Sequence, residues 1–154
     1  MAPSENVPVF LLHGWAGSFT DTWKKPGIDA LLEDIGRTVV GIDLLGHGDQ
    51  EKPHDPEAYS QLPEWFISQI DATYPVIDAV GFSLGALTLL RAVLLQPHRF
   101  RRVVLAGIGN GVFEQAVFVE PRNIPYIQSL LPNLNLRLVA LYLVVFLKAF
   151  LGCF

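Results

Sequence analysis

The sequence has little cysteine, little charge and few acidic residues in its second half. One cysteine, Cys153, occurs among the 154 residues, so no disulfide can form within the chain. A single cysteine fits a reducing compartment, and a cytoplasmic location is expected. Charged residues make up 17% of the chain and the net charge is -4. This balance argues against a protein that binds nucleic acid through its charge.

The amino-terminal end lacks the basic region that precedes the apolar run of a signal peptide. Its first apolar run, residues 7–12, instead ends at a His-Gly pair and is typical of a buried strand. The apolar fraction of 51% is enough to build a core, and the length suits one domain.

Short apolar runs bounded by turn residues alternate with segments of helical periodicity. This alternation predicts an α/β fold with a mostly parallel sheet of about four strands and flanking helices. The expected strands are residues 7–12, 38–45, 76–80 and 102–108, and the expected helices are residues 28–35, 60–72 and 84–95.

Two of these helices carry more detailed expectations. In the first, Leu31, Leu32 and Ile35 are expected to share one face. In the second, Ser60 is the expected N-cap.

The pentapeptide Gly81-Phe82-Ser83-Leu84-Gly85 lies between an expected strand and an expected helix. A G-x-S-x-G sequence in that context is typical of the nucleophile elbow, a sharp turn that projects the serine hydroxyl from the top of a sheet. Gly81 and Gly85 fit because a side chain there would collide where strand and helix pack closely. Ser83 is therefore the predicted nucleophile. The alternative is a structural turn that happens to contain glycine and serine.

His13-Gly14-Trp15 closes the first expected strand. In a serine site of this type, one oxyanion donor is the amide after the nucleophile, here Leu84, and the other comes from an adjacent loop, here Trp15. Because the donor is the backbone, the Trp15 side chain is free to shape the acyl pocket. His13 and Gly14 would support this loop. The alternative is a plain strand-to-helix turn.

Four blocks in order give a resemblance to a known family. VPVFLLHGWAGS, VVGIDLLGHGD, VIDAVGFSLGALTLL and PHRFRRVVLAGIG resemble the α/β-hydrolase superfamily, in its esterase-like branch, over about residues 7–110. The resemblance implies a strand order of second, first, third, fourth. It also implies a serine hydrolase that cleaves a small-molecule ester or related acyl substrate through an acyl-enzyme on Ser83, with no metal and no organic cofactor.

The sequence departs from this family after Ser83. The family order is serine, acid, histidine, but no aspartate follows Ser83 and the only later histidine, His98, precedes the later carboxylates Glu114 and Glu120. The triad acid and base are therefore unknown. A chain truncated or altered after about residue 112 is expected, with a hydrolase-like part at 1–111, a lid-like or irregular segment at 112–133 and an apolar helix at 134–154.

None of the four histidines stands out as the base. His13 is expected to be structural, and His47 to shape the top of the site. His54 is expected to be solvated, and His98 to lie at the end of the sheet opposite Ser83. Two carboxylates after the second strand are expected to be turn and cap residues, namely Asp43 and Asp49.

Residues 138–154 are almost wholly apolar, with Lys148 as the only charge. Three interpretations stay open: a membrane-associated helix near the lower length limit for spanning a bilayer, a core helix that covers an open sheet edge, or out-of-frame sequence with no role. For the chain as a whole, three functions stay open: a serine hydrolase, a catalytically inactive hydrolase fragment, and a membrane-associated protein.

Overall fold

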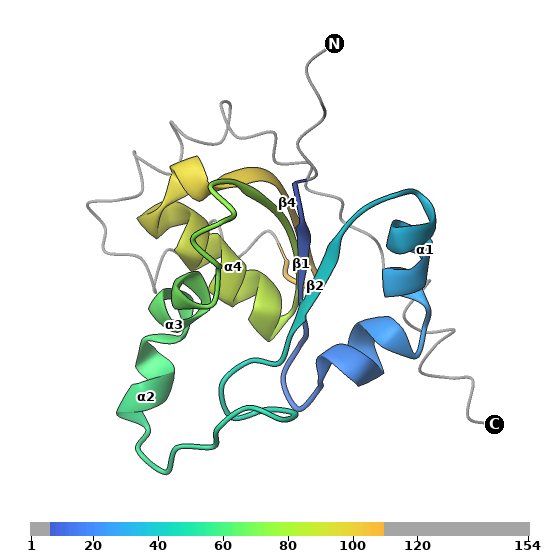
Figure 1. Cartoon of the computed structure of the whole chain (residues 1–154). Helices are drawn as coiled ribbons and strands as arrows, with labels where there is room; N and C mark the ends of the chain where they lie inside the picture. Colours follow the sequence, from blue (N-terminus) through green and yellow to red (C-terminus); the bar gives the residue numbers. More distant parts are fainter. Residues whose placement is uncertain (1–6, 110–154) are drawn as a thin grey trace, which may run out of the picture.

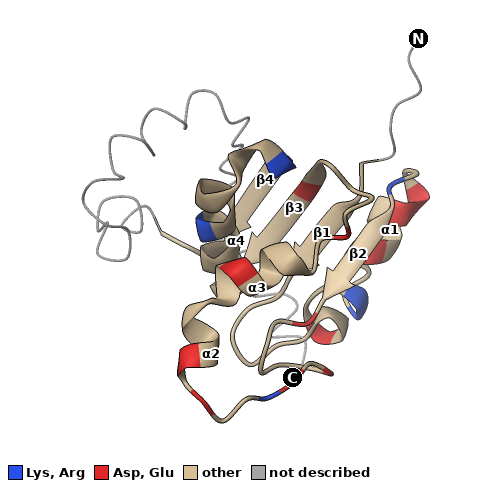
Figure 2. Cartoon of the chain, turned by 60° about the vertical axis from the view of Figure 1, so that its left-hand side comes forward, with Lys and Arg blue, Asp and Glu red and all other residues tan. Residues whose placement is uncertain are grey.

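Four parallel strands form the centre of the protein in the computed structural model, which describes residues 7–109. They are β1 (Val9–Leu12), β2 (Val39–Ile42), β3 (Ile77–Phe82) and β4 (Phe100–Ala106). Their order in the sheet is β2-β1-β3-β4, and every neighbouring pair is parallel (Figure 2). The predicted parallel sheet and its strand order are confirmed for this part of the chain.

Helices lie on both faces of the sheet. The α1 helix covers one face, and α3 and α4 cover the other (Figure 1). The helical elements are η1 (Thr20–Lys24, a π-helical turn), α1 (Ile28–Asp34), α2 (Glu57–Ser60), α3 (Leu62–Ser68), α4 (Leu84–Leu95) and η2 (Pro97–Arg99, a 3₁₀ turn).

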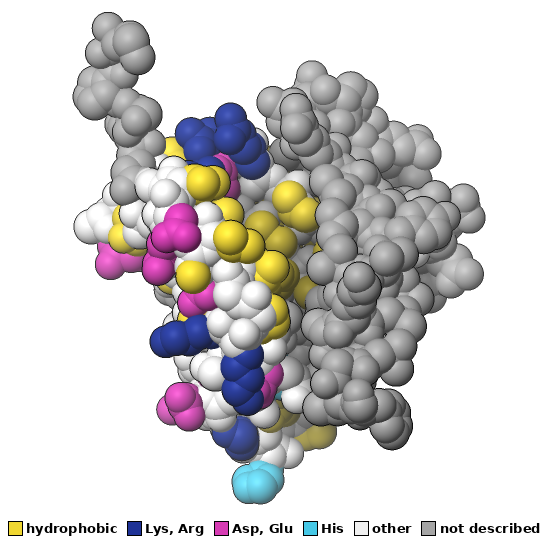
Figure 3. Space-filling model, turned by 90° about the vertical axis from the view of Figure 1, so that its right-hand side faces the viewer, with side chains coloured by type: hydrophobic (Ala, Val, Ile, Leu, Met, Phe, Trp, Pro, Cys, Tyr) yellow, Lys and Arg dark blue, Asp and Glu magenta, His cyan; other side chains and the backbone are white. Residues whose placement is uncertain are grey.

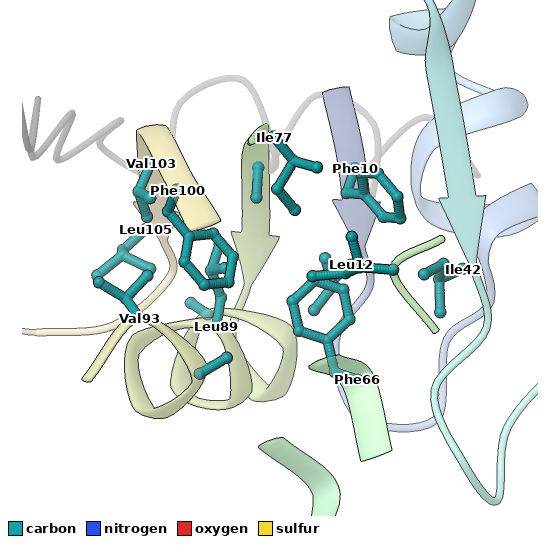
Figure 4. Packing of buried hydrophobic residues seen from close by; sticks show 14 of the residues in the cluster. Phe10, Leu12, Ile42, Phe66, Ile77, Leu89, Val93, Phe100, Val103 and Leu105 are labelled. Atoms are coloured by element: carbon teal, nitrogen blue, oxygen red, sulfur yellow. The ribbon is translucent and has the colours of Figure 1, made fainter. Parts of the chain in front are cut away.

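The larger apolar core fills the space between the sheet and the helices α3 and α4 (Figure 4). Phe10 and Leu12 point into it from β1, and Leu89 meets them from α4. Phe10 packs edge-on against Phe66 of α3, with ring centroids 6.2 Å apart. Burial of each such side chain contributes about 1.5–3 kcal/mol, so this face supplies most of the hydrophobic stabilisation of the described part.

The smaller core lies on the opposite face, over β1 and β2. Val9 and Leu11 point into it from β1, and Trp23 of η1 covers them. Ile28 and Leu32 of α1 pack against the same cluster. The two residues are four positions apart, so they lie one above the other on the inward side of the helix.

The expectation that Leu31 and Ile35 share a face with Leu32 is wrong. Leu31 is 63% exposed and Ile35 is 72% exposed, whereas Leu32 is partly buried in the smaller core. The reason is that α1 rests on the sheet through its 28–32 row, which turns the 31–35 row toward solvent.

The helix expected at 60–72 is shorter in the structure, where α3 runs from Leu62 to Ser68 and follows the separate short helix α2, and Ser60 is not an N-cap. Ser60 is the last residue of α2, and its hydroxyl donates to the Glu57 carbonyl oxygen at 2.7 Å. Pro63 explains the break, because a continuous helix would need its missing N–H and would force its ring against the carbonyl of Tyr59. In the first turn of α3 the same ring is tolerated.

All four strands differ from their expected limits. The β1 strand begins at Val9 rather than at residue 7, and β3 runs from Ile77 to Phe82 rather than ending at residue 80. The β2 strand ends at Ile42 rather than at residue 45, because the chain turns there into a loop held by side-chain hydrogen bonds. The β4 strand begins at Phe100 and ends at Ala106, since Gly107 adopts a left-handed conformation with φ of 70°.

The expectations for residues 112–133 and 134–154 fall outside the described residues. Within residues 7–109, no helix has the length and apolar character needed to cross a membrane.

Asp78 is a buried charge near the amino end of β3 that the sequence pattern did not single out. Its carboxylate is 6% exposed and accepts hydrogen bonds from Arg37 at 2.6 Å and from Arg101 at 3.0 and 2.8 Å. Burial by itself would raise the pKa of Asp78, but the hydrogen bonds from the two guanidinium groups outweigh it and hold the pKa below its usual value. The cluster joins β3 to the segment before β2 and to β4.

Replacing Asp78 with asparagine should lower the free energy of unfolding at neutral pH by about 2–3 kcal/mol. This is less than the ~3–5 kcal/mol of a fully buried pair, because Arg101 keeps 42% of its side chain exposed. Since the folded pKa is lowered, the stabilisation is complete above the ordinary value of 3.8 and disappears as the pH falls through the folded pKa.

Urea unfolding from pH 7 down to pH 3 measures this difference. The exposed Asp34→Asn serves as control and should change stability by less than about 0.5 kcal/mol. A difference between wild type and Asp78→Asn that stays constant with pH would contradict the assignment.

Candidate functional site

Ser83 lies on the sharp turn that joins β3 to α4. Its backbone has φ of 51° and ψ of -112°, a conformation that residues other than glycine rarely adopt. Its amide donates to the carbonyl oxygen of Ala106 at 2.8 Å, and its own carbonyl accepts from Leu87 at 3.0 Å. The turn is thus fixed to β4 on one side and to the first turn of α4 on the other.

The two glycines that flank Ser83 allow three segments to meet. A Cβ on Gly81 would lie 2.5 Å from the carbonyl oxygen of Gly85, and a Cβ on Gly85 would lie 2.5 Å from the carbonyl oxygen of His13. Real Cβ atoms do not approach backbone so closely, so neither position has room for a side chain. The first turn of α4 therefore packs directly on the ends of β3 and β1.

The loop after β1 passes beside the serine. A Cβ on Gly14 would lie 3.3 Å from the Cβ of Ser83. Trp15 follows, with 77% of its surface exposed. Among the described residues, neither the Trp15 amide nor the Leu84 amide has a hydrogen-bond acceptor. The amides of Trp15 and Leu84 are thus two available backbone donors, one in the loop after β1 and the other in the residue that follows Ser83.

His13 is fully buried and both of its ring nitrogens are engaged. Nδ1 lies 2.7 Å from the carbonyl oxygen of Gly14, and Nε2 accepts the amide of Leu44 at 2.9 Å. Burial lowers the pKa of His13 and keeps the ring neutral. With no free lone pair, this ring holds the loop after β1 against the loop after β2 and cannot take a proton from Ser83.

Asp43 joins the same two loops. One carboxylate oxygen accepts the amide of Phe19 at 2.6 Å and the other accepts the amide of Asp49 at 3.0 Å. The structure thus places Asp43 as a residue that holds a turn, while Asp49 takes part through its backbone amide. No local sequence pattern predicts the hydrogen bond from the amide of Phe19 to Asp43, because the two residues are 24 positions apart.

His47 lies in the loop after β2, with its ring between two others. The ring centroids are 5.2 Å from His13 and 5.4 Å from Trp15, and the contact with Trp15 is edge-to-face. Nδ1 is 3.1 Å from the carbonyl oxygen of Leu45. Because a carbonyl can only accept, Nδ1 carries the proton in this contact, and Nε2 has no partner among the described residues.

The two remaining histidines are exposed. His54 lies in the loop after β2, and His98 lies in η2, which precedes the amino end of β4. Ser83 follows the carboxyl end of β3, so His98 is at the opposite end of the parallel sheet. Within residues 7–109, the Ser83 hydroxyl has no hydrogen bond to any histidine, and no group of three metal-ligating side chains occurs.

A family model described as "alpha/beta hydrolase fold" matches residues 7–140. The chain is 34% identical over 106 residues to a 2-hydroxymuconate semialdehyde hydrolase of Pseudomonas putida, covering 67% of this chain and 37% of that protein. It is 33% identical over 116 residues to a haloalkane dehalogenase of Mycolicibacterium paratuberculosis, covering 68% and 35%. The chain thus spans less than two fifths of the length of these relatives.

Solved structures of hydrolases superpose on this chain as well. An epoxide hydrolase of Vigna radiata superposes with a TM-score of 0.59 at 27% identity, covering 66% of this chain and 32% of that one. A meta-cleavage product hydrolase superposes with a TM-score of 0.56 at 26% identity, covering 66% and 38%.

The strain at Ser83 predicts an unusual ranking of variants. Ser83→Gly should be more stable than Ser83→Ala by about 1 kcal/mol, because glycine relieves a conformation that costs other residues ~1–3 kcal/mol and loses part of this gain through its freer unfolded state. Urea unfolding of the two variants measures the difference. Equal stability, or a more stable Ser83→Ala, would mean that the turn is not strained in solution.

Proposed function

Because the chain belongs to the alpha/beta hydrolase fold family, we propose that it is a serine hydrolase that cleaves esters or related acyl substrates through an acyl-enzyme on Ser83. The observation that carries the proposal is the left-handed conformation of Ser83 between β3 and α4. A serine held in this way costs stability, and such strain is typical of a functional position.

The surrounding backbone supports the same reaction. The Ser83 oxygen would attack the acyl carbon, and the acyl oxygen would then carry negative charge. The amides of Trp15 and Leu84, which have no other acceptor in the described part of the chain, would donate to that oxygen. Leu84 is also the first residue of the twelve-residue helix α4, whose dipole favours negative charge at this end.

The reaction needs a base for the serine proton, and the described residues supply no established one. His13 is unsuited because both of its nitrogens are bonded. His47 has a free Nε2 and contacts Trp15, so it is the described histidine to test first. Collapse of the intermediate would break the bond between the acyl carbon and the ester oxygen and release the alcohol, which takes up the proton that the base removed from Ser83. Water would then attack the acyl carbon of the acyl-enzyme, and the acid and the free Ser83 would be released.

The substrate is proposed only as a class. Trp15 follows Gly14, which lies beside Ser83, and its exposed side chain would form part of the acyl pocket. The relatives act on different substrates by their names, so these names do not choose among acyl groups. A small-molecule substrate is therefore the extent of the proposal, with a catalytically inactive fold as the alternative.

Hydrolysis of a short-chain p-nitrophenyl ester by the purified chain should depend on Ser83. Ser83→Ala is expected to abolish turnover, because no other nucleophile is held on the strained turn. Stopped assays with wild type and Ser83→Ala in parallel measure this, and His47→Gln against His98→Gln then tests the base. A cooperatively folded sample without turnover would mean that the chain keeps the fold but not the activity.

The backbone role of residue 15 can be separated from that of its side chain. Trp15→Pro removes the amide proton and should lower kcat by about 10²–10³, the usual effect of losing one oxyanion donor. Trp15→Ala keeps the amide and should change kcat far less, with its main effect on KM. Proline restricts the backbone of the residue before it, and Gly14, which has no side chain, accommodates this restriction.

Steady-state kinetics on both variants, with thermal unfolding to verify folding, give the comparison. If Trp15→Ala lost as much kcat as Trp15→Pro, the side chain rather than the amide would carry the role.

A further inference from the structure

Ala16 has a backbone conformation that alanine rarely adopts. Its φ is 57°, in the left-handed region, and among residues 7–109 the only other non-glycine residue with a positive φ is Ser83. The two residues belong to neighbouring segments, because a Cβ on Gly14 would lie 3.3 Å from the Cβ of Ser83. Strain of this kind costs stability and is typical of functional positions. The two strained residues of the described part thus lie on the two segments that meet at the candidate site.

Ala16 is the third residue of a tight turn formed by residues 14–17. The amide of Gly17 donates to the carbonyl oxygen of Gly14 at 3.1 Å, which closes the turn. Trp15, the second residue, has no positive φ, so its combination with Ala16 is that of a type II turn. The third position of such a turn is normally glycine or asparagine. Alanine suits a type I turn better, because the third residue of that turn has a negative φ.

The two turn types differ in the peptide that joins Trp15 to Ala16. Both types keep the hydrogen bond between the first and fourth residues, but the middle peptide is turned over. Turning it over exchanges the Trp15 carbonyl and the Ala16 N–H across the plane of the turn. A carbonyl directed at a developing oxyanion would repel it, whereas an N–H would attract it. The φ of Ala16 therefore decides which of these two groups lies on each side of the turn.

The start of the turn is fixed by its contacts with the sheet. The carbonyl oxygen of Gly14 also accepts from Nδ1 of the buried His13 at 2.7 Å, since Nε2 of the same ring accepts the amide of Leu44. A Cβ on Gly14 would lie 3.0 Å from the ring of Phe82, so Gly14 packs closely on the end of β3. A trans peptide carries its carbonyl and its N–H on opposite sides, so the direction of the Trp15 amide is fixed as well.

The end of the turn is fixed by η1. A Cβ on Gly17 would lie 3.0 Å from Oγ1 of Thr22, and the amide of Thr22 donates to the carbonyl oxygen of Ser18 at 3.0 Å. The next residue, Trp23, is buried in the smaller core. The surface on the side where α1 lies carries acidic and basic side chains (Figure 3), whose exposed ion pairs contribute little. Trp23 is thus the main anchor of η1, and a turn fixed at both ends can keep a conformation that its third residue disfavours.

We propose that Ala16 is a positioning residue of the site, whose left-handed conformation holds the peptide between Trp15 and Ala16 in the orientation that favours an oxyanion. The inference rests on the proposed function of Ser83. Ala16 acts through the backbone of Trp15, and its exposed side chain takes no part. Position 16 therefore requires a residue that tolerates a positive φ, whatever the size or polarity of that residue.

Substitutions at position 16 separate backbone conformation from side-chain chemistry. Ala16→Gly and Ala16→Asn tolerate a positive φ, whereas the β-branched Ala16→Val and Ala16→Thr do not. Ala72 supplies the control, because it is exposed and lies in a turn closed by a bond from the Tyr74 amide to the Asp71 carbonyl at 3.0 Å, yet has no positive φ. Steady-state hydrolysis of a short-chain p-nitrophenyl ester is measured for these four variants, Ala72→Val and Ala72→Asn, with urea unfolding to verify folding.

Ala16→Val and Ala16→Thr should each lower kcat at least about ten-fold with little change in KM, as part of the ~10²–10³ effect of losing an oxyanion donor. Ala16→Gly, Ala16→Asn and both Ala72 variants should stay within about two-fold of wild type, and Ala16→Gly should unfold at a higher urea concentration because the strain is relieved. Because Ala16 is exposed, the β-branched side chains meet solvent and the variants should fold.

Two results would overturn the role of Ala16 in an active enzyme. One is a wild-type kcat in Ala16→Val, and the other is an equal loss of kcat in Ala16→Asn and Ala16→Val, which would assign the effect to side-chain size. Failure of the proposed function would look different, because the wild type and every variant would then lack turnover, and the role of Ala16 would fall with it.

Discussion

The close approach of α4 to the ends of β1 and β3 is the contact on which the rest of the site depends. It exists because Gly81 and Gly85 have no side chains, so the first turn of α4 lies against the backbone of His13. A methyl group at either glycine would push the helix away from the sheet. The approach determines where the chain must turn, and Ser83 is the residue that takes up the left-handed conformation at that turn.

Two side chains, His13 and Asp43, hold the loops around this contact and use all of their polar atoms in doing so. His13 uses both ring nitrogens to join the loop after β1 to the loop after β2, and Asp43 uses both carboxylate oxygens in the same region. The amides of Trp15 and Leu84 have no acceptor in the described part of the chain. In the proposed reaction, rigid support of this kind would let the backbone donors act without reorganisation when charge develops.

The two ends and the two faces of the sheet differ in the side chains that they carry. Near the amino ends of the strands, Asp78 and its two arginines join neighbouring segments through charge, far from Ser83. The α3–α4 face is filled by the larger core, while the α1 face is covered over β1 and β2. This difference follows from chain order, because the helices that the described segment contributes to the α1 face both precede β2.

The sequence by itself determined the parallel sheet and the turn at Ser83, because both depend on local patterns: apolar runs between turn residues, and glycines at fixed offsets from a serine. The sequence pattern gave a wrong prediction for Leu31, because the local spacing allows this residue on either side of α1. It also predicted a helix that began at Ser60, although Pro63 prevents a continuous helix there. Only the tertiary structure decided the role of Asp78 and the bond from His13 to Leu44. The partners in these bonds lie more than twenty residues away in the chain, and which polar groups meet is set by how strands and loops pack rather than by any nearby residue.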